Sequence, residues 1–349
     1  MVKVNVLKAG CGDSIHIQYT HEGVNKNILI DTGTSAMFSS GDDGRLRKLI
    51  KDLQSKGENI DLLIITHWDD DHIGGVLKWF EKDLECAKLM IKHIWFNSGT
   101  LINKYFNSIA ASEDKTKIYC CDSNTRTSTK QGVSFEKIIL ENRISHNLIK
   151  TDSSSCEINF LDGAKFTILS PTNIQLSKLC QEWKKYINKK TSSTSSDYSK
   201  TFEELLSNQF VEYTAVHNGS SIAFILEIED KNMLFLGDSH PSVIVSRLQE
   251  LGYSIRNKLK IDLMKISHHG SKANTSDDLL SMIECNKFII STHENTIHRL
   301  PNKETIARIV KHNENCKIYF NYNTLINKML RNELSGGHFS AFDTSELEL

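Results

Sequence analysis

One stretch, residues 62–75, restricts what this chain can fold into more than any other. It opens with four apolar residues, the pattern of a buried strand, and closes on Gly74 and Gly75 inside a helical pattern. Between them, two imidazoles and three carboxylates fall within six positions: His67, Asp69, Asp70, Asp71 and His72. So much like charge is costly unless cations neutralise it. The stretch therefore predicts a metal site. A solvated acidic helix N-terminus is the alternative, but it fits the apolar strand and the flanking histidines less well.

The spacing of these side chains predicts two ion positions. Alternate side chains of an extended segment share a side, so we expect His67 and Asp69 to converge on one ion. Asp71 and His72 turn with the chain toward a second ion. Asp70 is expected to face solvent.

Other predicted strands also end in residues of the ligand type. Asp238 follows an apolar run and is a candidate to bridge both ions. His268 and His269 follow another run, and either of them is a candidate for the second ion. Asp31 follows a third run, where a turn or a supporting role behind the ligands is the alternative to direct binding.

Strand and helix patterns alternate unevenly along the chain. Clusters of β-branched and apolar residues predict strands at 2–7, 14–19, 27–30, 62–66, 91–96, 165–169, 221–227, 232–236, 263–267 and 287–291. Helical periodicity predicts helices at 45–55, 73–84, 97–111, 134–139, 241–251, 277–283 and 302–311. The first strands follow one another closely, as hairpins do. This order favours an α/β fold of stacked mixed sheets flanked by helices over one doubly wound parallel sheet.

The chain is interpreted as one domain made of two similar halves, at about 1–180 and 210–349. A polar, Ser-rich insert at about 187–208 is expected to be an exposed loop between them.

Composition and charge narrow the classes of partner. The 42 Lys and Arg residues against 43 Asp and Glu give a formal net charge of -1, which excludes the general basic field of a protein that coats nucleic acid. No run approaches the roughly 18 apolar residues that span a bilayer, so no membrane is expected as a partner. The first residues alternate like a strand rather than a signal peptide, and we expect a cytoplasmic protein.

The 8 cysteines form no Cys-x-x-Cys pair and are expected to be reduced, packed as small apolar residues.

Several of these motifs resemble those of a known family. The string His67-x-Asp69-x-Asp71-His72, the step Gly237-Asp238 and the run His268-His269-Gly270-Ser271 are similar to motifs of metallo-β-lactamase-fold hydrolases. Within that fold they resemble the ComEC-like group, named after the soluble domain of a DNA-uptake protein. Segments 10–14, 218–222 and 298–301 extend the resemblance over most of the chain.

The resemblance implies an αββα sandwich with two divalent metal ions between the edges of its sheets. The implied ligands are His67, Asp69, Asp71, His72 and Asp238, with His268 or His269. Asp69 stands where the wider fold has His, and this harder oxygen donor makes manganese or magnesium plausible beside zinc. Cys11 stands where the resembling group usually has Gln. Whether His217 or Asn218 completes the first ion position stays open.

The resemblance also implies a metallohydrolase. Asp71 and His298 are the catalytic candidates, while Ser220, Ser221, Ser271 and Lys272 are candidates to bind substrate. Hydroxyls with one ammonium suit a phosphate group, so a phosphodiesterase or nuclease acting on a nucleic acid or nucleotide is the favoured function. Hydrolysis of another ester (a lactone, a thioester or a phosphorylcholine ester) is one alternative. A metal-binding subunit with a protein partner in a multi-protein bacterial system, for example one for defence, is the other.

Overall fold

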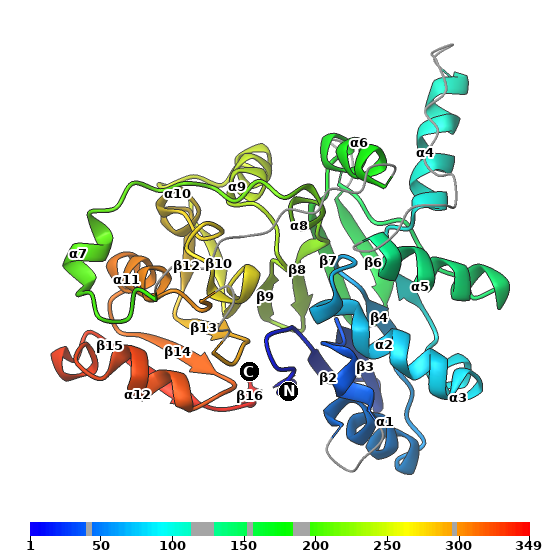
Figure 1. Cartoon of the computed structure of the whole chain (residues 1–349), viewed down its shortest axis with the longest axis horizontal. Helices are drawn as coiled ribbons and strands as arrows, with labels where there is room; N and C mark the ends of the chain where they lie inside the picture. The colour runs from blue at the N-terminus through cyan, green and yellow to red at the C-terminus, as the bar shows by residue number, and fades with distance from the viewer. Residues whose placement is uncertain (40–43, 113–128, 152–155, 184–195, 295–298) are drawn as a thin grey trace.

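The computed structural model of the chain describes residues 1–39, 44–112, 129–151, 156–183, 196–294 and 299–349. In this part of the chain, the strands form two large sheets and one small one (Figure 1).

The first sheet is mixed, with antiparallel strands at one side and parallel strands at the other. Its six strands run in the order β16 (Glu346–Glu348), β1 (Val2–Val6), β2 (Ile15–His21), β3 (Val24–Ile30), β4 (Leu62–Ile64) and β5 (Ile94–Trp95). Pairing is antiparallel from β16 to β3 and parallel from β3 to β5.

The second sheet is also mixed. Its eight strands run in the order β15 (Phe339–Asp343), β14 (Cys316–Phe320), β13 (Lys287–Ile290), β11 (Leu263–Lys265), β9 (Lys231–Phe235), β8 (Ala223–Ile228), β7 (Ala164–Ser170) and β6 (Glu157–Leu161). Pairing is parallel from β15 to β9 and antiparallel from β9 to β6. A separate parallel pair joins β10 (Leu259–Ile261) to β12 (Ile283–Cys285).

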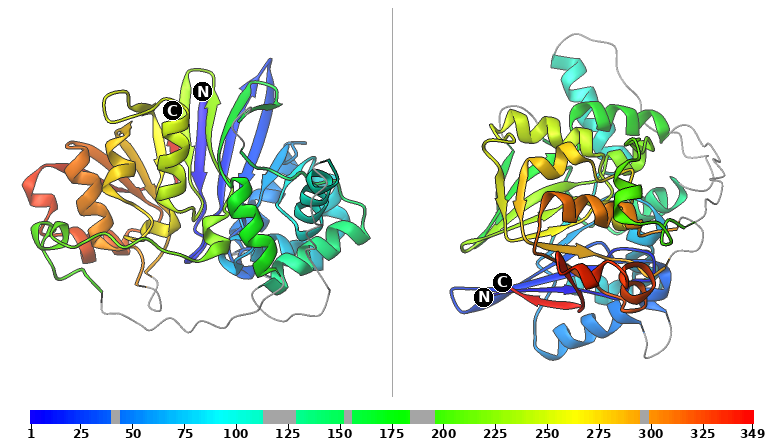
Figure 2. Two further views of the ribbon diagram at one scale, coloured as in Figure 1. Left: turned by 90° about the horizontal axis from the view of Figure 1, so that it is seen from above. Right: turned by 90° about the vertical axis from the view of Figure 1, so that its left-hand side faces the viewer.

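The two large sheets pack face to face, with helices on both outer sides (Figure 2). Alternation along each strand explains this arrangement. In β4, Leu62 and Ile64 lie in the apolar cluster between the sheets, whereas Leu63 points into the cluster under the helices. A strand that is apolar on both faces has to be covered on both sides. The expected α/β fold of two mixed sheets flanked by helices is therefore confirmed.

The helices divide between the two outer faces. The first sheet is covered through one apolar cluster by η1 (Ser35–Phe38), α1 (Arg45–Ser55), α2 (Asp70–Lys82), α3 (Leu84–Met90), α4 (Gly99–Ser112), α5 (Thr129–Glu141) and α6 (Asn173–Glu182). The second is covered through another cluster by α9 (Pro241–Glu250), α10 (Asp277–Ser281), α11 (Lys303–His312), α12 (Thr324–Leu330) and η3 (Leu334–Gly336). The short helices α7 (Phe202–Leu206), α8 (Val216–Gly219) and η2 (His268–Gly270) lie in connections.

Sequence patterns missed several elements. They did not predict β6, β10, β12, β14, α3, α6, α7, α8 or α12, and for residues 335–349, which contain β15 and β16, a short terminal strand was one of two interpretations. The expected Ser-rich insert falls partly on residues 184–195, which lie outside the described residues. Most residues of its described part are exposed, whereas Asp197 and Leu205 are buried. The Asp197 carboxylate accepts hydrogen bonds from the first backbone N–H groups of α11, those of Lys303 and Glu304, at 3.0 Å each.

Two further observations concern the cysteines and the helices. Cys11, Cys86, Cys156, Cys285 and Cys316 are free thiols, as expected. Cys180 is disulfide-bonded, so the expectation was wrong for this residue. Sequence spacing did not reveal it, since a disulfide depends on which cysteines meet in space. None of the helices in the described ranges combines the length and apolar character that crossing a membrane requires.

Candidate metal centre

The predicted ligands meet where strands of the two large sheets end. His67 follows β4 of the first sheet, Asp238 follows β9 of the second, and His268 follows β11 beside it. The backbone joins these ends, because the Ile222 N–H donates to the Thr66 carbonyl and the His268 N–H donates to the Gly237 carbonyl, both at 3.0 Å. The site is therefore shared by both sheets.

Unusual backbone conformations direct the ligands of the second sheet. Gly237 has φ of 52°, and a Cβ there would lie 3.1 Å from the Cβ of Ser221, so glycine suits this turn before Asp238. His268 and His269 have φ of 48° and 54°. Two successive non-glycine residues in the left-handed region carry strain, which is common where side chains are held for function. The turn aims both imidazoles at Asp238.

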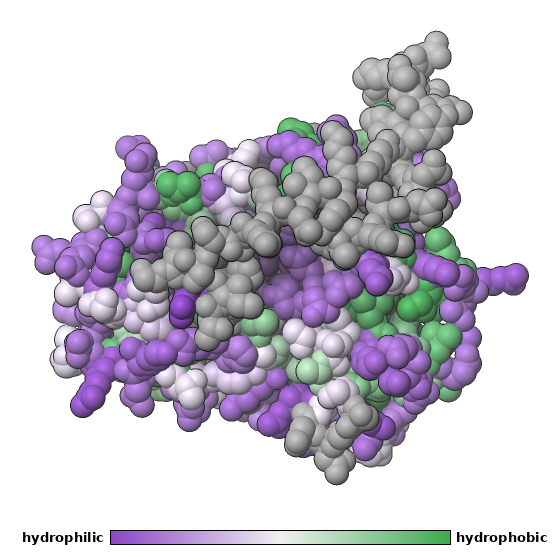
Figure 3. All heavy atoms as spheres, in the orientation of Figure 1, coloured by the Kyte–Doolittle hydropathy of each residue, from purple (hydrophilic) through white to green (hydrophobic). Residues whose placement is uncertain are grey.

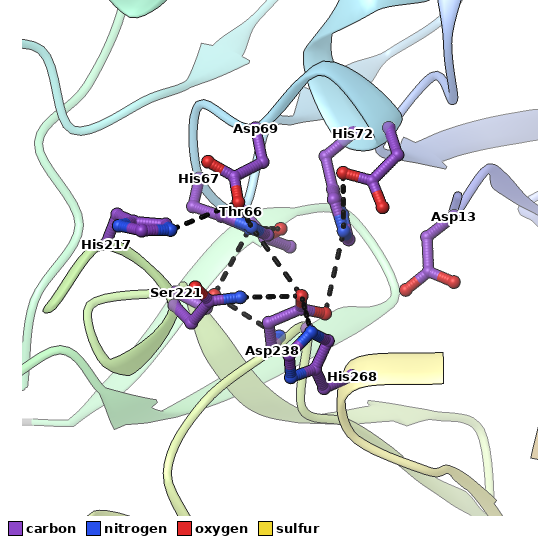
Figure 4. Close-up of polar contacts among 12 residues, drawn as sticks. Asp13, Thr66, His67, Asp69, His72, His217, Ser221, Asp238 and His268 are labelled. Atoms are coloured by element: carbon purple, nitrogen blue, oxygen red, sulfur yellow. Dashed lines mark hydrogen bonds and ion pairs between the residues drawn. The ribbon is translucent and has the colours of Figure 1, made fainter. Parts of the chain in front are cut away.

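The Asp238 carboxylate lies among the imidazoles of His67, His72, His268 and His269. Figure 4 labels the first three of them. Its Oδ2 is 3.7 Å from Nε2 of His67 and 3.6 Å from Nε2 of His268. Its Oδ1 is 3.5 Å from Nε2 of His72 and 3.9 Å from Nε2 of His269. Two ligand atoms on one tetrahedral zinc ion, each about 2.1 Å from it, are about 3.4 Å apart. The separations are thus long for hydrogen bonds and close to those of atoms that share an ion.

In three of the four imidazoles, the opposite nitrogen is held by a fixed acceptor. His72 Nδ1 pairs with Asp31 Oδ2 at 2.8 Å. His268 Nδ1 pairs with Asn274 Oδ1 at 2.9 Å, and His269 Nδ1 with the Ser291 carbonyl at 3.1 Å. These oxygens accept, so Nδ1 carries the proton and Nε2 is left to bind a cation.

The carboxylates of the His67–His72 segment separate into two groups. Asp69 Oδ2 lies 3.8 Å from His67 Nε2, on the side of Asp238 Oδ2. Asp71 lies with the other pair, since its Oδ2 is 3.2 Å from His269 Nε2 and its Oδ1 is 3.9 Å from His72 Nε2. The first group is therefore His67, Asp69 and His268, the second is Asp71, His72 and His269, and Asp238 lies between them.

Buried atoms without hydrogen-bond partners and an excess of negative charge both favour metal ions at this site. Among the described residues, Nε2 of His67, His72 and His269 and Oδ1 of Asp238 are buried without a hydrogen-bond partner. The cluster and its supports hold five carboxyl groups (Asp13, Asp31, Asp69, Asp71 and Asp238) against one ammonium, that of Lys265. The negative charge is thus in excess, and divalent cations would neutralise it.

Without ions, protons balance these carboxylates. Burial alone would lower the pKa of His269, but Asp13 and Asp238 raise it to about 10. Burial likewise opposes a charged His72, yet Asp238 and Asp31 raise its pKa well above the usual value. Burial would raise the pKa of Asp71, but His72 and His269 hold it below its ordinary range. The ion-free site thus contains imidazolium groups that cations would replace.

Two residues next to the first group remain candidates to complete the first ion position. His217 Nε2 lies 3.2 Å from Asp69 Oδ2. Burial would lower the pKa of His217, but the Asp69 carboxylate outweighs burial and raises this pKa to about 10. The Asn218 side-chain amide donates to Asp238 Oδ2 at 2.9 Å and so holds the shared carboxylate. Asp70 is exposed, as expected, and accepts from the Gln131 amide at 2.6 Å.

The candidate substrate-binding residues lie in several surroundings. Ser221 Oγ is buried 3.3 Å from His67 Nδ1 and accepts from the Asp238 N–H at 3.2 Å, so it holds ligands. The Ser220 hydroxyl donates to the His217 carbonyl, and the Ser271 hydroxyl accepts from the Ala273 N–H. Lys272 Nζ lies 3.1 Å from Glu304 of α11. His298 falls outside the described residues.

Sequence reasoning missed three residues at the site. Asp13 and Lys265 form a buried ion pair behind His269. Asp13 lies in segment 10–14, which is part of the family resemblance, but nothing in the sequence shows that its side chain faces a lysine on β11. The Tyr213 ring packs on His268 with centroids 5.0 Å apart.

Hydrophilic residues gather around the hollow at the middle of the face viewed in Figure 3.

Comparison with known proteins gives one family match. Residues 17–98 match the model of the metallo-β-lactamase superfamily, a segment that includes β2 to β5 and the His67–His72 cluster. The chain is also 21% identical over 320 residues to ComE operon protein 3 of Bacillus subtilis (strain 168). That alignment covers 89% of this chain and 31% of the relative, so the chain spans about a third of the relative's length.

Solved structures also match the whole chain at low identity. Zinc-bound PqqB from Methylobacterium extorquens is 11% identical, with a TM-score of 0.43, and 99% of this chain and 100% of that chain are covered. Tm1679, described as a metal-dependent hydrolase of the β-lactamase superfamily, is 11% identical, with a TM-score of 0.40 and coverage of 100% and 99%. The resemblance to the metallo-β-lactamase fold is thus confirmed by the family match together with the two mixed sheets and their outer helices.

Proposed function

We propose that this protein is a metal-dependent hydrolase that uses two divalent cations, manganese or zinc, to cleave phosphodiesters such as those of nucleic acids or nucleotides. One observation carries the proposal. Four imidazole Nε2 atoms surround the Asp238 carboxylate at 3.5 to 3.9 Å, and within the described residues three of them are buried without a hydrogen-bond partner. Such groups are costly in a protein that does not bind cations.

Each of the two groups of side chains would hold one ion. His67, Asp69 and His268 would hold one ion, Asp71, His72 and His269 the other, and Asp238 both. Bound there, two divalent ions lower the pKa of a water and stabilise charge that develops on the reacting oxygens. Asp31, Asn274 and the Ser291 carbonyl orient the rings. Because the pKa of Asp71 is held low, Asp71 serves as a ligand better than as a proton acceptor.

A phosphodiester is favoured over an uncharged ester by the donors around the ions. Three carboxylates give hard oxygen ligands, which suit manganese as well as zinc. Tyr213 adds a donor beside His268: burial, Asp69 and Asp238 raise its pKa, so the phenol keeps its proton at neutral pH and can donate to a phosphoryl oxygen. Ser271 and Lys272 remain candidates for the same role.

The test is hydrolysis of bis-p-nitrophenyl phosphate by metal-stripped protein reloaded with Mn²⁺ or Zn²⁺. The blank is the double variant Asp71→Ala, His72→Ala, which lacks two ligands of the second group. We expect turnover that depends on the added ion and is absent from the blank. Asp230→Asn, at an exposed carboxylate away from the cluster, is the matched control and should keep the rate.

Each other result selects a different function. Turnover of p-nitrophenyl acetate without turnover of the diester would replace the phosphodiesterase by a hydrolase of another ester. Tight binding of two ions with no turnover of either compound would contradict catalysis by the protein alone. That result would favour a metal-binding subunit that works with a protein partner.

A further inference from the structure

A buried lysine lies directly behind the second group of ligands. Lys265, the last residue of β11, is 1% exposed, and its ammonium contacts Asp13 Oδ2 and lies 3.5 Å from the Gly237 carbonyl. Lysine is almost never fully buried unless it is paired. A buried ion pair is, however, no more stabilising than a well-packed apolar pair of similar shape. The pair between Lys265 and Asp13 therefore calls for a reason other than stability.

The second oxygen of Asp13 faces a ligand. Asp13 Oδ1 lies 3.3 Å from His269 Nδ1 and, within the described part of the chain, is buried without a hydrogen bond of good geometry. The Asp13 main chain is fixed beside the same group, since its N–H donates to the Asp71 carbonyl at 3.1 Å and its carbonyl accepts from the Gly33 N–H at 2.7 Å. Asp13 thus contacts the second group through both its backbone and its side chain.

His269 is the link between Asp13 and the ion position. Its Nδ1 donates to the Ser291 carbonyl at 3.1 Å and also faces Asp13, while its Nε2 lies 3.2 Å from Asp71 Oδ2. A carboxylate behind a metal-binding imidazole fixes the ring and makes it a better ligand, and loss of such a partner typically costs about 10- to 100-fold in metal affinity.

We propose that Asp13, fixed and charge-compensated by Lys265, is a positioning residue that holds His269 toward the ion of the second group. The inference rests on the two-ion site of the proposed function, although it needs no particular substrate. The Lys265 ammonium stabilises the ionised form of Asp13 beside four other carboxyl groups. The negative charge of Asp13, next to Nδ1 of His269, then makes that ring a stronger ligand.

The experiment compares Asp13→Asn, Lys265→Met and the double variant that carries both changes. The probe is Mn²⁺ alone, added to metal-stripped protein. Calorimetric titration gives the affinity and stoichiometry, electron paramagnetic resonance detects a coupled pair of Mn²⁺ ions, and urea unfolding gives the stability. No substrate is needed, so the result does not depend on which ester the protein cleaves.

Stability and ion binding should respond differently. Each single variant leaves one buried charge unpaired and should be destabilised, whereas the double variant should recover most of the stability. The affinity for the second Mn²⁺ should fall about 10- to 100-fold in Asp13→Asn and remain low in the double variant, because both lack the carboxylate behind His269. If a single variant does not fold, the double variant still decides the point.

A second lysine–aspartate pair, whose lysine is half exposed, provides the control. Asp61, just before β4, accepts from Lys92 Nζ at 2.8 Å, at the end of the strand opposite His67. The double variant Asp61→Asn, Lys92→Met should bind both ions as the wild type does. Wild-type affinity for the second ion in the Asp13 and Lys265 double variant would overturn the inference and leave Asp13 a structural partner of Lys265. Failure of the wild type to bind Mn²⁺ at all would instead overturn the two-ion site itself.

Discussion

At the scale of single residues, Asp238 has the most connections in the site. Two imidazoles face each of its oxygens, and the Asn218 amide and Ser221 hydroxyl fix it from behind. The two ligand groups share no other side chain, so the proposed ions depend on each other through this carboxylate.

Replacing Asp238 should therefore affect both ions at once. Asp238→Asn keeps the shape but removes the charge, and we expect at least about a 100-fold loss of affinity for each ion, since even partners that only support a ligand cost 10- to 100-fold. Mn²⁺ titration of metal-stripped protein measures the effect, with Asp230→Asn as control. Retention of one ion at wild-type affinity would show that Asp238 serves a single position.

The raised pKa values predict a strong pH dependence of ion binding. His269, with its pKa raised to about 10, and His72, with its pKa well above the usual value, are protonated in the ion-free protein at neutral pH. Each must lose its proton to bind a cation, so affinity should fall as pH falls, by about tenfold per proton per pH unit. Calorimetry of Mn²⁺ binding at pH 7 in two buffers of different ionisation enthalpy should report the release of about two protons. No release would contradict imidazolium groups at the site.

The residues of the site differ in how far the sequence could predict them. His67, Asp69, Asp71 and His72 are close in sequence, so local spacing suffices to bring them together. The ion pair of Asp13 and Lys265 joins residues 252 positions apart, and Lys265 has the sequence pattern of an ordinary lysine at the end of a strand. Such a pair depends on how two sheets pack, which no local pattern contains.

At the scale of elements, the helix α2 carries Asp71 and His72 in its first turn, and it begins close against the first sheet. An added Cβ on Gly75 would lie 2.1 Å from the Thr32 carbonyl oxygen, just after β3. The His72 carbonyl accepts from the Thr32 N–H at 2.7 Å in the same contact. Glycine at this position therefore sets the distance between the helix and the sheet.

Gly75→Ala should push α2 away from the sheet. We expect a loss of about 1–3 kcal/mol in the free energy of unfolding, the usual cost of overpacking, together with weaker ion binding because His72 moves with the helix. Urea unfolding and Mn²⁺ titration measure the two effects. Gly336→Ala, where the nearest atom is the side chain of His338, is the control. Unchanged binding in Gly75→Ala would mean that the cluster tolerates a shift of α2.

Elements were predictable where their patterns are long. The amphipathic helix α1 and the strands around the sheet interface follow the expected ranges. The strands β10 and β12 have three residues each, too few for alternation to stand out. The helix α6 was missed although Thr172 and Gln175 form a capping box at its start, a signal that was present in the sequence.

At the scale of the whole molecule, the two sheets do not follow the predicted halves of the chain. Strands β6 and β7 precede residue 180 yet belong to the second sheet, and β16 comes last yet belongs to the first. Strand order along the chain could suggest stacked sheets, but pairing between distant segments decides which strand joins which sheet. The ligand cluster connects the same two sheets.

Ions that connect both sheets should stabilise the folded chain. Free Mn²⁺ at 100 times its dissociation constant adds about 2.7 kcal/mol per site, which should raise the midpoint of thermal unfolding by about 5 °C or more. Scanning calorimetry of metal-stripped protein with and without Mn²⁺ tests this, and Asp238→Asn should show little change. An equal shift in that variant would place the stabilising ions outside the cluster.

The pairing of β16 with β1 has a consequence for how the protein is made. Val6 donates its N–H to the Ser345 carbonyl, and Leu349 donates to the Val2 carbonyl, so one edge of the first sheet is formed by the last residues of the sequence. A ribosome makes β1 before β16. Until β16 has been made, the β1 edge therefore has open hydrogen-bonding groups, and the nascent chain would need a chaperone or rapid synthesis of β16 to keep that edge from pairing with another molecule.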